Sequence, residues 1–165
     1  TLSSSSAASD VYKRQIPASE PTAMNGRWVA APGDDLLHAA ALAIGSLPII
    51  AEDLGVITPA VDGLRQRHGL PGMRVLQFAF SPEQDAGSRY LPHQYTADSV
   101  VYTGTHDNDT SLGWWQTLPE ATRQHVRDYL ACDGHDIAWS LIHAACASVA
   151  GMAIYPMQDL SLIHI

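Results

Sequence analysis

Acidic residues follow two short apolar runs of the sequence, at the point where each run ends. Glu52 and Asp53 follow the run LPIIA, and the tetrapeptide HDND at residues 106–109 follows the run SVVYTGT. A buried charge is costly unless something pairs with it or uses it. Glu52 therefore fits either a catalytic carboxylate or a structural ion pair. The HDND segment fits a catalytic cluster, a site for a divalent metal with oxygen and imidazole ligands, or the cap of a following helix.

The segments around these clusters predict an alternation of strands and helices. Short apolar runs rich in β-branched residues predict strands, and apolar residues at helical spacing predict helices. The predicted strands are 47–51, 73–80, 99–105 and 152–155, and the predicted helices are 34–44, 59–67, 119–130 and 136–149. Residues 16–33 are rich in proline, glycine and small side chains, which predicts a long loop.

This alternation is typical of the α/β class, in which helices connect the strands of a parallel sheet. Three of the predicted strands begin about 26 residues apart, close to the roughly 30 residues per unit of a (β/α)8 barrel. An open, doubly wound sheet gives a similar alternation, but the sequence lacks the G-x-G-x-x-G pattern of a dinucleotide-binding sheet. About two βα units separate Glu52 from Asp107. We therefore expect both carboxylates to open into one mouth at the carboxyl ends of the strands.

Composition limits the classes of partner. The 165 residues carry a formal net charge of -8, which argues against nucleic acid, because phosphate binding requires a basic face. No apolar run approaches the roughly 20 residues of a membrane helix. Two cysteines, Cys132 and Cys146, are too few for a disulfide framework and predict buried free thiols. These features predict a cytoplasmic protein.

Both ends of the chain carry a signature of foreign DNA. Residues 10–15 are DVYKRQ and residues 160–165 are LSLIHI. A DNA sequence that encodes the first segment can be chosen so that its complementary strand, read in the opposite direction, encodes the second segment. Inverted copies of one sequence resemble the adaptor of a transposase-based sequencing library. We therefore expect residues 1–15 and 160–165 to be non-native, and residues 16–159 to be part of a catalytic barrel.

Five blocks of the sequence resemble the amylomaltase, or disproportionating-enzyme, family of 4-α-glucanotransferases. They are IIAEDLGVITPAVDGLR, GLPGMRVLQFAF, YLPHQY, VVYTGTHDNDTSLGWW and AIYPMQDL, and they occur in the order expected of the family. The resemblance spans nearly all of residues 16–160. It implies an α-amylase-like (β/α)8 TIM barrel, of which this chain supplies the later half, from about the fifth strand to the eighth.

The resemblance also implies roles for individual residues. Glu52 matches the general acid/base, and Asp107 matches the aspartate that stabilises the transition state. His106, beside it, resembles a ligand of the sugar hydroxyls. Three further candidates rest on their positions alone: Asp53 and Asp109 fit either residues that orient the catalytic groups or surface and cap residues, and Trp114 fits either a stacking platform for sugar or simple packing. The family's nucleophilic aspartate belongs to an earlier strand and has no counterpart in this chain, so we expect the chain alone to be inactive. Retaining transfer uses two carboxyls roughly 5–5.5 Å apart and requires no metal or organic cofactor.

The activity implied is transfer of α-1,4-glucan segments between maltooligosaccharides, glycogen or starch-derived dextrins. Three alternatives remain open from the sequence. An α-glucan hydrolase would use the same barrel and carboxylates with water as acceptor. A glucan-binding module would have no turnover, and a metal-dependent hydrolase would be built on the HDND segment. Neither nucleic acid nor a membrane is expected as a partner.

Overall fold

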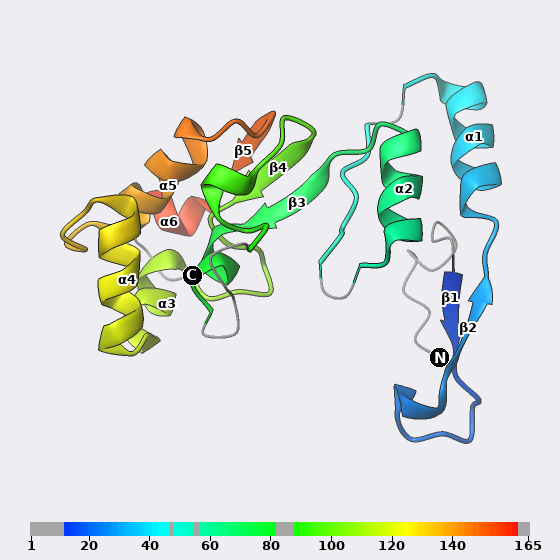
Figure 1. Cartoon of the computed structure of the whole chain (residues 1–165), viewed down its shortest axis with the longest axis horizontal. Coiled ribbons are helices and arrows are strands. Elements are labelled where there is room, and N and C mark those ends of the chain that lie inside the picture. Colours follow the sequence, from blue (N-terminus) through cyan, green and yellow to red (C-terminus); the bar gives the residue numbers. More distant parts are fainter. Residues whose placement is uncertain (1–11, 47, 55–56, 82–87, 162–165) are drawn as a thin grey trace. The chain divides into compact units, whose positions relative to one another are not determined.

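The computed structural model of the chain describes residues 12–46, 48–54, 57–81 and 88–161 (Figure 1). The chain divides into two compact units, Thr1–Pro71 and Gly72–Ile165, and each is described by itself. None of the helices within these described ranges has the length and apolar content of a membrane span.

The first unit begins with a two-stranded antiparallel ladder. Strand β1 (Tyr12–Gln15) pairs with β2 (Arg27–Ala30), and Arg14 lies opposite Trp28. The prediction of an uninterrupted loop over 16–33 is therefore wrong, because pairing with another strand, rather than composition, decides the conformation of residues 27–30. Strand β1 lies in the segment predicted to be non-native. That prediction concerns the origin of the DNA and stays a prediction.

Two predicted helices of the first unit are confirmed. Helix α1 (Gly33–Ile44) has two acidic residues, Asp34 and Asp35, in its first turn, where the positive end of the helix dipole stabilises negative charge. Helix α2 (Pro59–Arg67) begins with a proline, and the hydroxyl of the N-cap residue Thr58 accepts a hydrogen bond from the backbone N–H of Val61. Both helices contribute to one small core of Leu37, Leu64 and Leu70, with Ala51 packed against it.

An ion-pair cluster joins the start of α1 to the end of α2. Asp34 Oδ1 lies 2.8 Å from His68 Nε2 and 3.2 Å from Arg67 Nη2. The hydrogen bond from His68, followed by that from Arg67, holds the pKa of Asp34 below its ordinary value. This cluster is exposed, so its contribution to stability is small and screened by salt.

The predicted strand at 47–51 does not form a ladder in the first unit. Residue 47 lies outside the described residues, residues 48–50 have no strand pairing, and Ala51 forms a single bridge in which its N–H donates to the carbonyl of Pro71 at 2.8 Å. An apolar, β-branched run favours burial, but a strand also requires a hydrogen-bonded neighbour. Residues 48–50 have no such neighbour among the described residues of this unit.

The second unit is built on a three-stranded parallel sheet. Its strands are β3 (Gly72–Val75), β4 (Ser99–Tyr102) and β5 (Met152–Ile154), in the spatial order β3-β4-β5. The register pairs Met73 with Val100 and Val100 with Met152. The prediction of parallel strands in this half of the chain is confirmed.

Among the described residues of this unit, four α-helices accompany the sheet, and their course can be followed in Figure 1. They are α3 (Ser111–Thr117), α4 (Glu120–Leu130), α5 (Ile137–Ala147) and α6 (Met157–Ser161). Helix α5 is the central one, since it contacts α3, α4, α6 and β5. Its buried residues are Ile137, Ala138, Leu141, Ile142 and Ala145. The two long helices α4 and α5 confirm the sequence prediction, whereas the short α3 and α6 were not predicted.

Two predicted strands are longer than the observed ones. The run at 73–80 is a strand only to Val75 and continues as a 3-10 helix over Leu76–Phe80, and the run at 99–105 ends as a strand at Tyr102. Both runs are buried at almost every position, so neither shows the alternation that separates strand from helix. Strand ends in such runs depend on backbone pairing rather than on side-chain type.

The cysteine prediction is only half right. Both cysteines are free. Cys146 is exposed on α5 and Cys132, which follows α4, is partly exposed, so neither is the buried thiol that the apolar surroundings predicted. The buried residues of α5 recur with the helical period and form one face of the helix, and Cys146 lies outside that face and is exposed to solvent.

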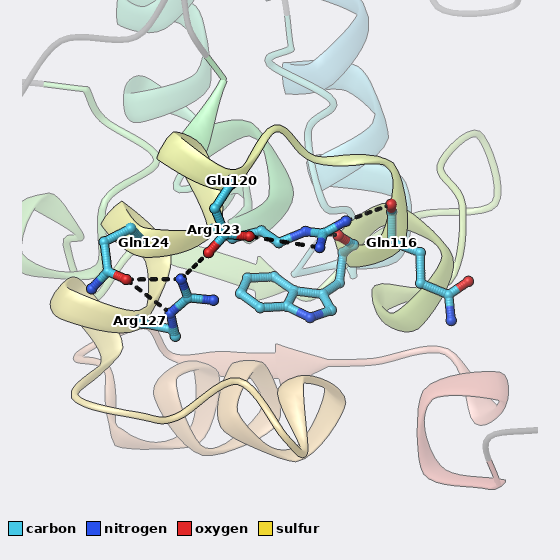
Figure 2. A network of polar contacts seen from close by, with 6 residues as sticks. Gln116, Glu120, Arg123, Gln124 and Arg127 are labelled. Carbon is cyan, nitrogen blue, oxygen red and sulfur yellow. Dashed lines mark hydrogen bonds and ion pairs between the residues drawn. The ribbon is translucent and has the colours of Figure 1, made fainter.

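Two arginines lie over Trp115 at the junction of α3 and α4, and Figure 2 shows these arginines, Arg123 and Arg127, with their polar partners. The guanidinium carbons of Arg123 and Arg127 each lie 5.7 Å from the centre of the indole ring, a cation–π distance. Arg123 Nε also donates to the Trp115 carbonyl at 3.0 Å. Glu120 is ion-paired with Arg127, and this contact, as the largest cause, lowers the pKa of Glu120. Trp115 is therefore a packing residue of the second unit.

Large apolar side chains are exposed in both units. In the first unit they are Ile16, Met24, Leu36, Leu42, Ile44, Ile49 and Ile50, and in the second Trp139, Val149, Met152, Ile154 and Met157. Met152 and Ile154 lie on β5, which pairs with β4 alone among the described strands.

Candidate active site

A polar loop follows the middle strand of the parallel sheet. After β4 the backbone passes through the buried Thr103 and Gly104 and then forms a tight turn. Asn108 Oδ1 accepts hydrogen bonds from the backbone N–H of Thr105 at 2.9 Å and from its hydroxyl at 2.8 Å. The N–H of Asn108 in turn donates to the Thr105 carbonyl at 3.1 Å. These bonds close the turn and fix the residues at its tip.

His106 and Asp107 occupy that tip and face solvent. Their side chains are 91% and 81% exposed, and His106 Nε2 lies 3.2 Å from Asp107 Oδ1. An exposed pair of this kind adds little to stability. It does present an imidazole and a carboxylate side by side at the carboxyl end of a parallel strand, and both groups can hydrogen-bond to hydroxyls of a ligand.

The far side of the loop leads directly into helix α3. Asp109 Oδ1 accepts from the N–H of Thr110 at 2.7 Å. Thr110 is the N-cap of α3, and its hydroxyl accepts from the N–H of Gly113 at 3.1 Å. The capping interpretation of this part of HDND is therefore confirmed for Thr110. A Cβ added at Gly113 would overlap the Asp109 carboxylate, so the loop lies tightly against the first turn of the helix.

Gln77 holds the loop from the neighbouring strand. This residue follows β3, is 6% exposed, and donates from Nε2 to the backbone carbonyl of Asp109 at 2.9 Å. A Cβ at Gly104 would lie only 2.7 Å from the same nitrogen, so glycine at that position provides the space that the Gln77 amide occupies.

Asp159 is the buried acid of this region that sequence reasoning left without a role. It lies on α6, is 1% exposed, and accepts hydrogen bonds from Thr103 and Ser111, the residues that border the loop. The only signal in the sequence is a Gln-Asp pair just beyond the last strand, which does not reveal a partner about 50 positions earlier in the chain.

Trp114 and His93 lie near this region and differ in their surroundings. Trp114 lies on α3, is partly exposed, and its ring centre is 6.2 Å from that of Phe80. It lies in the helix that the loop enters. His93 is exposed and its Nδ1 lies 2.8 Å from the Tyr129 hydroxyl, which gives it a structural partner.

Glu52 and Asp53 belong to the first unit and are described separately from the loop. Glu52 is exposed, whereas Asp53 is 3% exposed. The bridge from Ala51 to Pro71 fixes the backbone just before them. The shared cleft of Glu52 and Asp107 stays a prediction, since the two residues lie in different units.

The described residues include no group of three or more histidine, cysteine, aspartate or glutamate side chains that could hold a metal ion. The HDND loop as described therefore offers a ligand surface of one imidazole and one carboxylate at its tip, with Asn108 engaged in the turn and Asp109 in contact with the helix start.

The family profile of 4-alpha-glucanotransferases matches residues 13–164. The chain belongs to the 4-alpha-glucanotransferase family. It is 50% identical over 153 residues to a 4-alpha-glucanotransferase of Thermus thermophilus, a match that covers 88% of this chain and 30% of the relative. It is 51% identical over 148 residues to a 4-alpha-glucanotransferase of Synechocystis, covering 88% of this chain and 29% of that one.

Solved structures show the same relationship. The amylomaltase from Streptococcus agalactiae in complex with acarbose matches with a TM-score of 0.82 and 33% identity, covering 90% of this chain and 30% of that one. The amylomaltase from Corynebacterium glutamicum matches with a TM-score of 0.61 at 16% identity, which bears on the fold alone. The chain is therefore a segment of the amylomaltase fold, and it spans about 30% of the length of the relatives it matches.

These matches confirm the family that the five sequence blocks indicated. Of the predicted site residues, the structure brings His106, Asp107 and Asp109 together in one loop and places Trp114 in the helix that follows. The roles assigned to these four, and to Glu52 and Asp53, stay predictions, as does the cytoplasmic location.

Proposed function

We propose that the whole protein to which this chain belongs transfers segments of α-1,4-glucan from one chain to another by a retaining double displacement. The observation that carries the proposal is the His106–Asp107 tip, exposed at the carboxyl end of the middle strand of a parallel sheet. Catalytic groups of α/β barrels occupy that end of the strands. Within this proposal the chain supplies the later half of a (β/α)8 barrel, from about the fifth strand to the eighth.

The proposed roles follow the chemistry of a glycosidic bond. Glu52 protonates the leaving oxygen and later deprotonates the hydroxyl of the acceptor sugar. Asp107 accepts hydrogen bonds from hydroxyls of the distorted sugar and stabilises the positive charge that develops at the anomeric carbon. His106 binds a neighbouring hydroxyl. The nucleophilic carboxylate comes from a part of the protein outside this chain.

Three weaker roles complete the site. Asp109 shapes the loop against the start of α3, Trp114 offers an indole face to a sugar ring, and the buried Asp53 orients its neighbour Glu52. The proposed substrates are maltooligosaccharides and glycogen- or starch-derived dextrins. The structural relative that was solved with acarbose supports an oligosaccharide as the class of ligand.

Maltotriose as the only substrate tests this function in the full-length protein. Transfer yields glucose together with oligosaccharides longer than maltotriose, whereas hydrolysis yields glucose and maltose without longer products. We expect Glu52→Gln to lower kcat by about 10²–10⁴-fold, the contribution of a general acid/base. We expect Asp107→Asn to lower it by about 10²–10³-fold, the contribution of one group that stabilises transition-state charge.

Asp128→Asn is a suitable control, because Asp128 is an exposed acid on α4 that lies outside the loop. It should leave kcat unchanged, and the 165-residue chain by itself should give no transfer. The proposal fails if longer oligosaccharides are absent from the products of the unmutated protein. The assigned roles fail if Glu52→Gln or Asp107→Asn transfers as fast as the control.

A further inference from the structure

The buried carboxylate of Asp159 accepts three hydrogen bonds within the second unit. Its Oδ2 accepts hydrogen bonds from the hydroxyls of Thr103 and Ser111, each at 2.7 Å, and its Oδ1 accepts from the backbone N–H of Ser111 at 2.8 Å. All three residues are at most 1% exposed. Hydrogen bonds to an ionised group are about twice as strong as neutral ones, and burial protects these bonds from competition by water.

The two partners of Asp159 border the loop that carries the site. Thr103 directly follows β4, and Ser111 is the first residue of α3, so residues 104–110 span the distance between them. One carboxylate on α6 thus binds both ends of the loop at once. The span cannot lengthen, shorten or rotate at its base without breaking at least one buried, charge-assisted bond.

The tip itself has weak attachments of its own. His106 and Asp107 are exposed and contact each other, and the backbone N–H of Asp107 donates to the hydroxyl of Thr105 at 3.3 Å. The orientation of the tip therefore depends on the geometry of the two ends and on the Gln77 contact to the Asp109 carbonyl. Of these supports, Asp159 is the one that connects both ends.

We propose that Asp159 is a positioning residue for the reaction: its buried carboxylate ties Thr103 to Ser111 and thereby holds His106 and Asp107 in their working geometry. The proposal rests on the function proposed above, in which these two side chains bind the distorted sugar. Displacing a reacting group by about 1 Å can cost on the order of 10²-fold in rate, even when the mutated residue does not touch the substrate.

Two substitutions of Asp159 distinguish the loss of its hydrogen bonds from the loss of its charge. In Asp159→Asn the remaining side-chain oxygen can accept from the Ser111 N–H, while the new NH2 group can donate to the two hydroxyl oxygens, which rotate to accept. The tie is therefore kept although the charge is lost. In Asp159→Ala the tie is absent and the Ser111 N–H is left buried without its acceptor.

Ser99→Ala is the matched control. Ser99 begins the same strand β4 at its other end, is 1% exposed, and its hydroxyl donates to the Thr96 carbonyl at 2.6 Å. This variant also removes a buried hydrogen bond from β4, but it leaves the loop untouched. Thr103→Val, which frees only the β4 end of the loop, replaces Asp159→Ala if the latter does not fold.

The test measures maltotriose transfer by the full-length protein at a temperature well below the melting temperature of every variant. We expect Asp159→Ala to lower kcat by roughly 10²-fold with KM nearly unchanged, since the lost geometry matters in the transition state. Asp159→Asn should restore kcat to within about tenfold of the unmutated protein, because the amide keeps the hydrogen bonds that tie Thr103 to Ser111. Amide hydrogen exchange of residues 104–111 should accelerate in Asp159→Ala and not in Ser99→Ala.

Two results would overturn the inference. One is a kcat of Asp159→Ala no lower than that of Ser99→Ala. The other is an Asp159→Asn variant as slow as Asp159→Ala while its amides stay protected, because the charge rather than the tie would then carry the effect. If the unmutated protein does not transfer glucan, the proposed function is wrong, and this result does not bear on Asp159. In that case the amide exchange rates of residues 104–111 alone decide whether Asp159 holds the loop.

Discussion

Replacing Gly104 by alanine is the sharpest steric test of how the site loop is packed. The backbone at Gly104 lies outside the left-handed region, so the position requires glycine for space and not for its dihedral angles. The added Cβ would lie 2.7 Å from Gln77 Nε2 and 3.3 Å from Gln77 Cδ, whereas carbon atoms in good contact are about 3.5–4.0 Å apart. One of the two residues must move.

Gln77 cannot move away without loss. It is 6% exposed, and the nitrogen that blocks the new methyl group donates to the Asp109 carbonyl at 2.9 Å. Overpacking of a buried site costs about 1–3 kcal/mol, and breaking the Gln77–Asp109 bond adds about 0.5–1.5 kcal/mol. We therefore expect Gly104→Ala to lower the free energy of unfolding by roughly 2–4 kcal/mol.

A double-mutant cycle with Gln77→Ala isolates the steric term. Removing the Gln77 amide also removes the clash, so Gly104→Ala should cost less than about 0.5 kcal/mol in the Gln77→Ala background. The measurement is urea-induced unfolding of the full-length protein, used only where two probes give coincident transitions. Equal costs of Gly104→Ala in the two backgrounds would refute the packing described for this loop.

Two further predictions concern regions away from the loop. The ion pairs of Glu120 depress its folded-state pKa, so they contribute stability that is fully present above the unfolded value of 4.5 and is lost as the pH falls through the folded pKa. A Glu120→Gln variant should therefore be as stable as the parent at low pH and less stable above pH 4.5. Stability curves of the two proteins that run parallel from pH 2 to 7 would count against this prediction. Gly63→Ala should stabilise helix α2 by about 0.5–1 kcal/mol, since glycine is unfavourable inside a helix and, within the described part of the chain, the new Cβ meets only Arg67 Nη1, at the ordinary contact distance of 3.6 Å. A lower melting temperature of this variant would contradict the prediction.

The long helices were predictable from the sequence because their signals are local. A threonine cap followed by proline defines the start of α2, and a helical period of apolar residues defines α1 and α5. The end of β3 and the 3-10 helix after it were not predictable. Residues 75–77 are all buried, so the sequence carries no alternation there, and the backbone pairing that ends the strand is a tertiary property.

The same division applies to the candidate site. The loop at 106–109 was found because polar residues follow an apolar strand directly, and a cap of the following helix was one of the interpretations that its residue types allowed. Asp159 could not be assigned, because its partners are 48 and 56 positions away and only the fold brings them together. The strand predicted at 47–51 failed for a related reason, since apolar side chains cannot specify a hydrogen-bonded neighbour.

Because the tip is exposed, its two side chains contribute little to the stability of the folded chain. His106 and Asp107 bury almost none of their side-chain surface, so replacing them removes little of the free energy that keeps the chain folded. Chaperones and proteases recognise proteins by their unfolded fraction, which such replacements leave nearly unchanged. Under the roles proposed for these two residues, a cell carrying a variant at either position would therefore accumulate normal amounts of a protein with slowed transfer, and abundance would give no warning of the defect.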